Sequence, residues 1–159
     1  MKIRTGLGYD VHQLQEGEDF WLGGIKIDHH KGAVGHSDAD VLIHTICDAL
    51  LGAANQRDIG YHFADTDPKF KGIDSKILLK EVMELVRGEG FEVINIDSTI
   101  CLQRPKINPY IPEMKAVLCE VMEIPEEDLS IKATTTEKLG FVGKEEGVAA
   151  MCTVLISKP

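Results

Sequence analysis

The chain has 159 residues, of which 43% are hydrophobic and 27% charged, and its acidic excess gives a formal net charge of −9. Nucleic acids and anionic membranes bind clustered Lys and Arg, so this charge argues against both as partners. The length suits one well-packed domain, residues 1–159, and is too short for two.

The first half of the chain changes its apolar period from strand to helix. Residues 2–12 alternate like a strand, and residues 20–27 predict a second strand with a bend at Gly23-Gly24. Ser37 can cap a helix over about residues 38–54. A turn-rich stretch, residues 56–72, follows this helix.

The second half of the chain again combines predicted helices and strands. Asp74 or Ser75 can cap a helix that runs to about Gly88, and a β-branched strand follows over residues 91–102. Prolines end this strand and precede a third helix over residues 110–122, while residues 130–135 and 147–156 predict two more strands. The order predicts an α/β fold, an α+β sandwich with a ferredoxin-like mixed sheet and helices on one face.

No run approaches the roughly 20 apolar residues that span a bilayer, and the start of the chain lacks the apolar segment of a secretory signal. We therefore expect a cytoplasmic protein, or one of a plastid-type organelle if a transit peptide was removed. The four cysteines lie in apolar runs without C-x-x-C spacing, which indicates reduced core residues.

Three side chains form a candidate metal site. Asp10 and His12 are two residues apart on a strand and project from the same face, and a helix can bring His44 to the same point. Three such ligands with a fourth place open are typical of catalytic Zn²⁺. The alternative is that these are polar residues at a strand end that find ordinary hydrogen bonds.

Two loops add further polar groups. Residues 63–68 place two carboxylates in a turn, and residues 132–141 place hydroxyls and a carboxylate at a strand end. Hydroxyl and backbone N–H groups there suit phosphate oxygens, and Glu137 can hold a Mg²⁺ that bridges them. For the threonines, β-propensity alone is the competing explanation.

Six motifs in order, over nearly the whole chain, resemble the 2-C-methyl-D-erythritol 2,4-cyclodiphosphate synthase family. They are G-Y-D-V-H (8–12), H-S-D-A-D (36–40), D-A-L-L-G-A (48–53), D-I-G (58–60), D-T-D-P-x-F-K-G (65–72) and K-A-T-T-T-E-K-L-G-F (132–141). The resemblance implies a lyase that forms a cyclic diphosphate and CMP from 4-diphosphocytidyl-2-C-methyl-D-erythritol 2-phosphate in the non-mevalonate isoprenoid pathway. It also implies a homotrimer with active sites at subunit interfaces.

The resemblance assigns roles to individual residues. Asp10, His12 and His44 become the Zn²⁺ ligands, Glu137 the ligand of a second ion, Mg²⁺ or Mn²⁺, and Thr135 a further catalytic residue. His36, Ser37, Phe63 and Asp65 are expected around the methylerythritol part, and Asp58 and Gly60 at the ribose. Thr134, Thr135 and Lys106 are expected at the diphosphate and cytosine in an adjoining subunit. Phe141 and Lys144 complete the substrate-binding set.

Several of these residues keep a second interpretation. Ser37 can be a helix cap as well as a ligand contact, and Lys106 can be a solvated charge. Asp40 and Asp48 lie four residues either side of His44, so either can orient its ring, although a solvent-facing or helix-dipole role suits at least one of them better.

The chain departs from the family pattern at three positions. Ala64 stands where proline is common, Arg104 adds a cation to the 103–106 turn, and Lys144 stands where many relatives carry an arginine that lines the trimer's central cavity. That cavity is linked to isoprenoid diphosphates, and lysine lacks the bidentate fork of arginine. A Zn²⁺-dependent phosphoester hydrolase and a non-catalytic isoprenoid-diphosphate-binding trimer are the two alternative functions.

Overall fold

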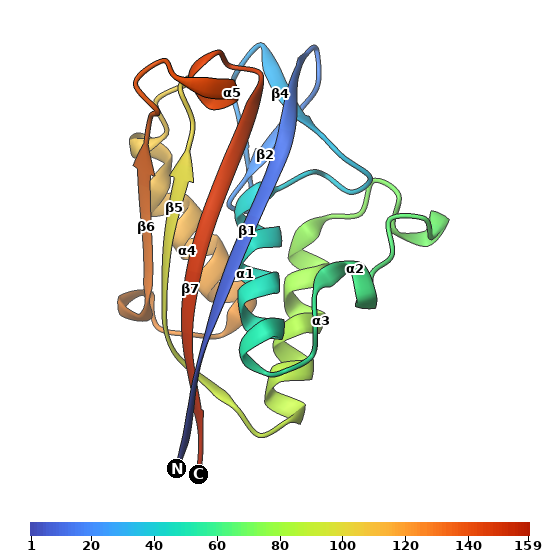
Figure 1. Cartoon of the computed structure of the whole chain (residues 1–159), viewed down its shortest axis with the longest axis vertical. Helices are drawn as coiled ribbons and strands as arrows, with labels where there is room; N and C mark the ends of the chain where they lie inside the picture. Colours follow the sequence, from blue (N-terminus) through green and yellow to red (C-terminus); the bar gives the residue numbers. More distant parts are fainter.

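A mixed five-stranded sheet in the order β4-β1-β7-β5-β6 forms one layer of the molecule (Figure 1). The structure is a computed structural model that describes residues 1–159. Its strands are β1 (Lys2–Glu16), β2 (Phe20–Leu22), β3 (Ile25–Ile27), β4 (Lys31–Val34), β5 (Glu92–Cys101), β6 (Leu129–Thr134) and β7 (Gly147–Lys158). Its α-helices are α1 (Val41–Ala53), α2 (Ile59–His62), α3 (Ser75–Gly88), α4 (Ile111–Met122) and α5 (Gly140–Gly143), and three short 3₁₀ turns cover residues 68–70, 108–110 and 126–128.

The longest ladder in the sheet joins the two ends of the chain. Strand β1 is antiparallel to β7 from the pair Lys2 and Lys158 to the pair Gln13 and Gly147. Strand β5 is antiparallel to β7 and parallel to β6, so the sheet is mixed. The strand predicted over residues 20–27 is instead a β2–β3 hairpin, because Gly23 and Gly24 both adopt positive φ and reverse the chain. The short edge strand β4 was not predicted.

Helices α1, α3 and α4 lie together on one face of the sheet (Figure 1), as predicted. Between these layers lies a core of 37 buried residues, which includes Ile43, Ile46 and Leu50 of α1 and Val148 and Val154 of β7. The two faces of β1 therefore differ. Its odd-numbered apolar residues point away from the helices and remain exposed, namely Ile3, Leu7, Tyr9 and Val11.

Helix α1 starts later than predicted, because Asp40 and not Ser37 is its cap. The Asp40 side chain accepts a hydrogen bond from the backbone N–H of Ile43, which satisfies one of the free donors of the first turn. The Ser37 hydroxyl accepts from the Ala39 N–H instead, before the chain turns at Ala39 with a φ of 58°. Helix α3 begins at Ser75 with Asp74 as its cap, as predicted.

Two glycines allow α1 to pack closely against β1. A Cβ on Gly6 would lie 1.9 Å from the Ala49 carbonyl oxygen, and one on Gly8 would lie 2.0 Å from the Thr45 carbonyl oxygen. The strand and the helix therefore touch backbone to backbone near the positions of Asp10 and His44. None of the helices has the length and apolarity that a bilayer crossing needs.

Candidate functional site

Three side chains from two elements converge beside the β1–α1 contact. His12 Nε2 lies 2.9 Å from Asp10 Oδ2, and His44 Nδ1 lies 3.2 Å from the same oxygen. The two imidazole nitrogens are 3.0 Å apart. Strand β1 supplies Asp10 and His12 from one face and α1 supplies His44, which is the arrangement that the sequence predicted.

The donor chemistry of this cluster fits a divalent cation. The second nitrogen of His12, Nδ1, lies 3.2 Å from the Val34 carbonyl oxygen of β4, which can only accept a hydrogen bond. His12 therefore carries a proton on Nδ1, and its Nε2 faces Asp10 and His44, where it can bind a cation once it is unprotonated. A carboxylate oxygen and imidazole nitrogens are suitable ligands for Zn²⁺, and the three ligand atoms lie within 4.8 Å of one another.

The neighbours of Asp10 keep its carboxyl group ionised. Burial opposes ionisation of this carboxyl, but hydrogen bonds and the positive charge of the His12 and His44 imidazoles outweigh burial and keep the pKa of Asp10 well below its ordinary value. The side chain is 26% exposed, while that of His44 is only 8% exposed. The cluster thus has an ionised oxygen at its open end and a buried imidazole behind it.

The cluster opens into a cavity of about 370 Å³ between β1, α1, α2 and the N-terminal end of α3. This cavity, called here the metal-side cavity, contains eight of the residues singled out from the sequence. They are Asp10, His12, His36, Ser37, His44, Gly60, Phe63 and Asp65. Apolar side chains that the sequence reasoning missed complete its wall, among them Ile59, Phe70, Ile73 and Leu78.

Two carboxylates hold the wall formed by α2. Asp48 of α1 accepts a hydrogen bond from the Ile59 N–H at 2.9 Å, and Asp58 caps α2 by accepting from the Tyr61 N–H at 2.9 Å. Burial raises the pKa of the Asp48 carboxyl. Asp58 is not among the residues that line the cavity, whereas Gly60, two residues later, is part of its wall.

A second loop closes over the other side of the metal-side cavity. His36 Nε2 lies 3.0 Å from the Asp67 carbonyl oxygen, and the Gly72 N–H donates to the His36 carbonyl at 2.7 Å. These bonds join the His36–Ser37 segment to the turn that carries Asp65. The two loops that the sequence placed at the substrate are thus fastened to each other.

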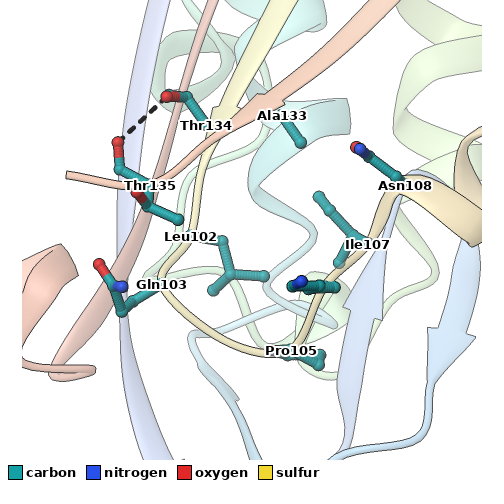
Figure 2. A pocket seen from close by; sticks show the side chains of 9 residues that line it. Leu102, Gln103, Pro105, Ile107, Asn108, Ala133, Thr134 and Thr135 are labelled. Atoms are coloured by element: carbon teal, nitrogen blue, oxygen red, sulfur yellow. Dashed lines mark hydrogen bonds between the residues drawn. The ribbon is translucent and has the colours of Figure 1, made fainter. Parts of the chain in front are cut away.

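A separate cavity of about 240 Å³ lies between the ends of β5 and β6. Figure 2 shows Thr134 and Thr135 on one side of it and Ile107 and Asn108 on the other. Lys106 also lines this cavity, which shares no residue with the metal-side cavity. Within one subunit, the predicted nucleotide contacts are therefore apart from the predicted metal ligands.

Besides Asp58, three of the predicted residues lie in neither cavity. Glu137 is exposed in the loop after β6 with a φ of 54°, and its carboxylate pairs with no residue of the chain. Phe141 and Lys144 lie in and just after α5, where Phe141 is 42% exposed. The structure does not bring Glu137 to the Asp10 cluster within one subunit.

Neither Asp40 nor Asp48 hydrogen-bonds the ring of His44. The buried Asp40 carboxylate accepts from the N–H groups of Gly23, Gly24 and Ile43 and so ties the β2–β3 turn to α1. The partners of the second ring nitrogen of His44, Nε2, are two serine hydroxyls, Ser37 and Ser75. No periodicity links Ser75 to His44, which is why the sequence did not reveal it.

Comparisons with known proteins agree with this geometry. Residues 3–157 match the model of the YgbB family. The chain is 64% identical to the 2-C-methyl-D-erythritol 2,4-cyclodiphosphate synthase of Bacteroides thetaiotaomicron over 99% of both chains. Its fold is similar to the bifunctional IspDF of Campylobacter jejuni (TM-score 0.95, 42% identity), covering 99% of this chain but 43% of that one. It is also similar to the CDP complex of IspF from Plasmodium falciparum (TM-score 0.87, 32% identity), covering 99% and 97%.

Proposed function

This chain belongs to the YgbB family, and we propose that it carries out the reaction of the 2-C-methyl-D-erythritol 2,4-cyclodiphosphate synthases at a site shared between two subunits. That reaction converts 4-diphosphocytidyl-2-C-methyl-D-erythritol 2-phosphate into 2-C-methyl-D-erythritol 2,4-cyclodiphosphate and CMP. It is a step in the synthesis of isoprenoid precursors and makes the chain a CMP-forming lyase.

The observation that carries this proposal is the convergence of Asp10, His12 and His44 at the metal-side cavity. One carboxylate and two imidazoles suit Zn²⁺, whereas a lone carboxylate such as Glu137 suits Mg²⁺ or Mn²⁺, which keep several other oxygen ligands. Divalent cations held by these side chains would orient phosphate oxygens and polarise the phosphorus as Lewis acids.

The remaining residues bind and orient the substrate. Ser37, Phe63 and Asp65 surround the space next to the cluster and suit the hydroxyls and carbon skeleton of the methylerythritol part. His36 reaches the same space and is held there by the Asp67 carbonyl. Asp58 and Gly60, at the start of α2, are placed for the ribose.

The second cavity suits the nucleotide end. The Thr134 hydroxyl donates to the Thr135 carbonyl, whereas the Thr135 hydroxyl accepts from the Glu137 N–H and keeps its own proton free. Thr135 is therefore the threonine that can donate to a diphosphate oxygen. Lys106 adds a cation near the same phosphates. Phe141 and Lys144 extend from α5, and Lys144 is the candidate contact for an isoprenoid diphosphate in the central cavity of the trimer.

The chemical step needs little from acid–base side chains. An oxygen of the 2-phosphate forms a bond to the β-phosphorus, the bond from that phosphorus to the bridging oxygen breaks, and CMP leaves with that oxygen. Holding the two phosphates in line converts this displacement into a favourable intramolecular reaction. The protein contributes the position of the reacting groups and the exclusion of competing water.

Two features support a homotrimer with shared sites. The metal-side and nucleotide cavities are separate in one subunit, although one substrate must reach both. The outer face of the sheet exposes an apolar row, with Leu7 71% and Tyr9 56% exposed, which suits burial against further copies of the chain. Cyclic symmetry would then form three equivalent sites.

The reaction is tested with purified protein, the cytidyl substrate, Zn²⁺ and Mg²⁺. We expect CMP by chromatography and the cyclic diphosphate by phosphorus NMR, with no oxygen taken from ¹⁸O-labelled water. Release of a linear phosphate that carries solvent oxygen would instead identify a hydrolase.

The shared site is tested by mixing two inactive variants, His44→Ala and Thr135→Ala. Random subunit exchange should leave about one quarter of the interfaces with an intact metal half and an intact nucleotide half, so about a quarter of the activity should return. The control mixture of His44→Ala with Asp10→Ala damages the same half twice and should stay inactive. If mass spectrometry shows complete exchange and neither mixture is active, both halves of each site must come from a single subunit.

A further inference from the structure

The nitrogen of His44 that points away from the metal cluster faces two serine hydroxyls. His44 Nε2 lies 2.9 Å from Ser75 Oγ and 3.0 Å from Ser37 Oγ. His44 is 7% exposed and Ser75 is fully buried at the start of α3. An imidazole with one proton can place it on Nε2, toward the serines, or on Nδ1, toward Asp10.

The orientation of the Ser75 hydroxyl is fixed by a carboxylate behind it. Ser75 Oγ lies 2.5 Å from Asp38 Oδ1, and the Ser75 N–H donates to Asp38 Oδ2 at 2.9 Å. Asp38 Oδ1 also accepts from the Asp40 N–H at 3.1 Å. A carboxylate with both oxygens facing N–H donors accepts the Ser75 proton as well, so Ser75 Oγ turns a lone pair toward His44.

A hydroxyl lone pair opposite Nε2 requires the proton of the ring to be on Nε2. The opposite nitrogen, Nδ1, then carries a lone pair directed at Asp10 and His12, as a metal ligand must. Ser37 does not determine this choice, because no carboxylate fixes the direction of its hydroxyl. Its oxygen accepts from the Ala39 N–H, which leaves the Ser37 proton free to point into the cavity.

We infer that Ser75, with its hydroxyl held by Asp38, is a positioning residue that keeps His44 in the Nε2–H tautomer and presents Nδ1 to the metal. This inference rests on the zinc site of the proposed function. It links the metal ligand to the segment that carries His36 and Ser37, because Asp38 directly follows that segment and its backbone N–H donates to the Ile73 carbonyl at 3.1 Å. Asp38 thus connects this segment to the start of α3 and, through Ser75, to the ring of His44.

The test compares two buried serines by zinc affinity. Ser75→Ala removes the acceptor from His44 but leaves the Ser75 N–H bonded to Asp38, so the loop keeps its anchor. Ser98→Ala is the matched control, because Ser98 is 1% exposed and its hydroxyl donates to the Ser130 carbonyl on β6, away from the cluster. We expect Ser75→Ala to raise the zinc dissociation constant about 10- to 100-fold and Ser98→Ala to leave it unchanged, as measured by competition with a chelator.

A second measurement uses the wild-type protein and therefore does not depend on whether a variant folds. Long-range proton–nitrogen NMR on the metal-free wild-type protein, at a pH where the His44 ring carries a single proton, should show that proton on Nε2. A proton on Nδ1, or equal zinc affinity of the two serine variants, would overturn the role of Ser75 alone. Failure of the wild-type protein to bind zinc would instead overturn the metal site itself, so the two failures are distinct.

Discussion

Adding one methyl group to Gly8 should separate the two elements that carry the proposed metal ligands. A Cβ at this position would lie 2.0 Å from the Thr45 carbonyl oxygen, and Cβ atoms essentially never approach another heavy atom within 3.0 Å. In Gly8→Ala, strand β1 and helix α1 must therefore move apart by about 1 Å at this point. The obstacle is backbone, so no side chain can rotate away to relieve it.

This separation of β1 from α1 would occur close to both Asp10 and His44. Asp10 follows Gly8 by two residues, and His44 directly precedes Thr45. Metal sites tolerate ligand distances within about 0.2 Å, so a shift of about 1 Å is large. We expect zinc affinity to fall at least tenfold and the free energy of unfolding of the metal-free protein to fall by about 1–3 kcal/mol, the usual cost of overpacking.

Gly52→Ala is the matched control, because it adds the same methyl group to α1 where no atom beyond the local helix backbone lies within 4 Å. This variant should be stabilised by up to about 1 kcal/mol, since alanine is the better helix former, with zinc affinity unchanged. Urea unfolding without metal and zinc titration against a chelator measure both quantities. If Gly8→Ala matched the control in both, close contact of α1 with β1 would not be what assembles the site.

Three further variants test other parts of the site. His44→Ala should lose zinc and CMP release while keeping its fold, and full zinc occupancy by atomic emission would remove His44 from the ligand set. Glu137→Gln should require more Mg²⁺ for activity at unchanged zinc content, and an unaltered Mg²⁺ titration would contradict its assignment. Asp40→Asn should lower the free energy of unfolding by about 1–3 kcal/mol, because an amide cannot accept from all three backbone N–H groups that the carboxylate binds; an unchanged urea midpoint would refute this.

The parts of the structure that could be predicted from the sequence are those fixed by local periodicity. The strand predicted over 91–102 spans 92–101, and the helix predicted from about residue 75 to 88 spans 75–88. The approach of Asp10 to His12 follows from strand geometry alone. Edge strand β4 has four residues, too few for alternation to stand out, and it was missed.

The partner of the His44 ring could not be predicted in this way. Asp40 lies one helical turn before His44, and spacing alone makes it, like Asp48, a candidate for the orienting group. Its carboxylate accepts instead from the Ile43 N–H at the helix start, where an aspartate cap is stabilising, and from two N–H groups of the β2–β3 turn. Ser75 is 31 residues from His44 and meets it only through the packing of α3 on α1, which a local pattern does not encode.

The charge of the metal-side cavity explains why cations are needed there. The cavity lining includes Asp10 and Asp65 but no lysine or arginine, in a chain whose formal net charge is −9. A substrate with several phosphates would meet repulsion from these carboxylates, and backbone N–H groups alone do not cancel a full charge. A divalent cation held by Asp10, His12 and His44 would offset this repulsion, and a second cation held by Glu137 of a neighbouring subunit would add to the positive charge at the shared site. Acidic residues argue against a polyanionic ligand when they are counted over the whole chain, but at this site Asp10 would help to hold the cation that lets such a ligand bind.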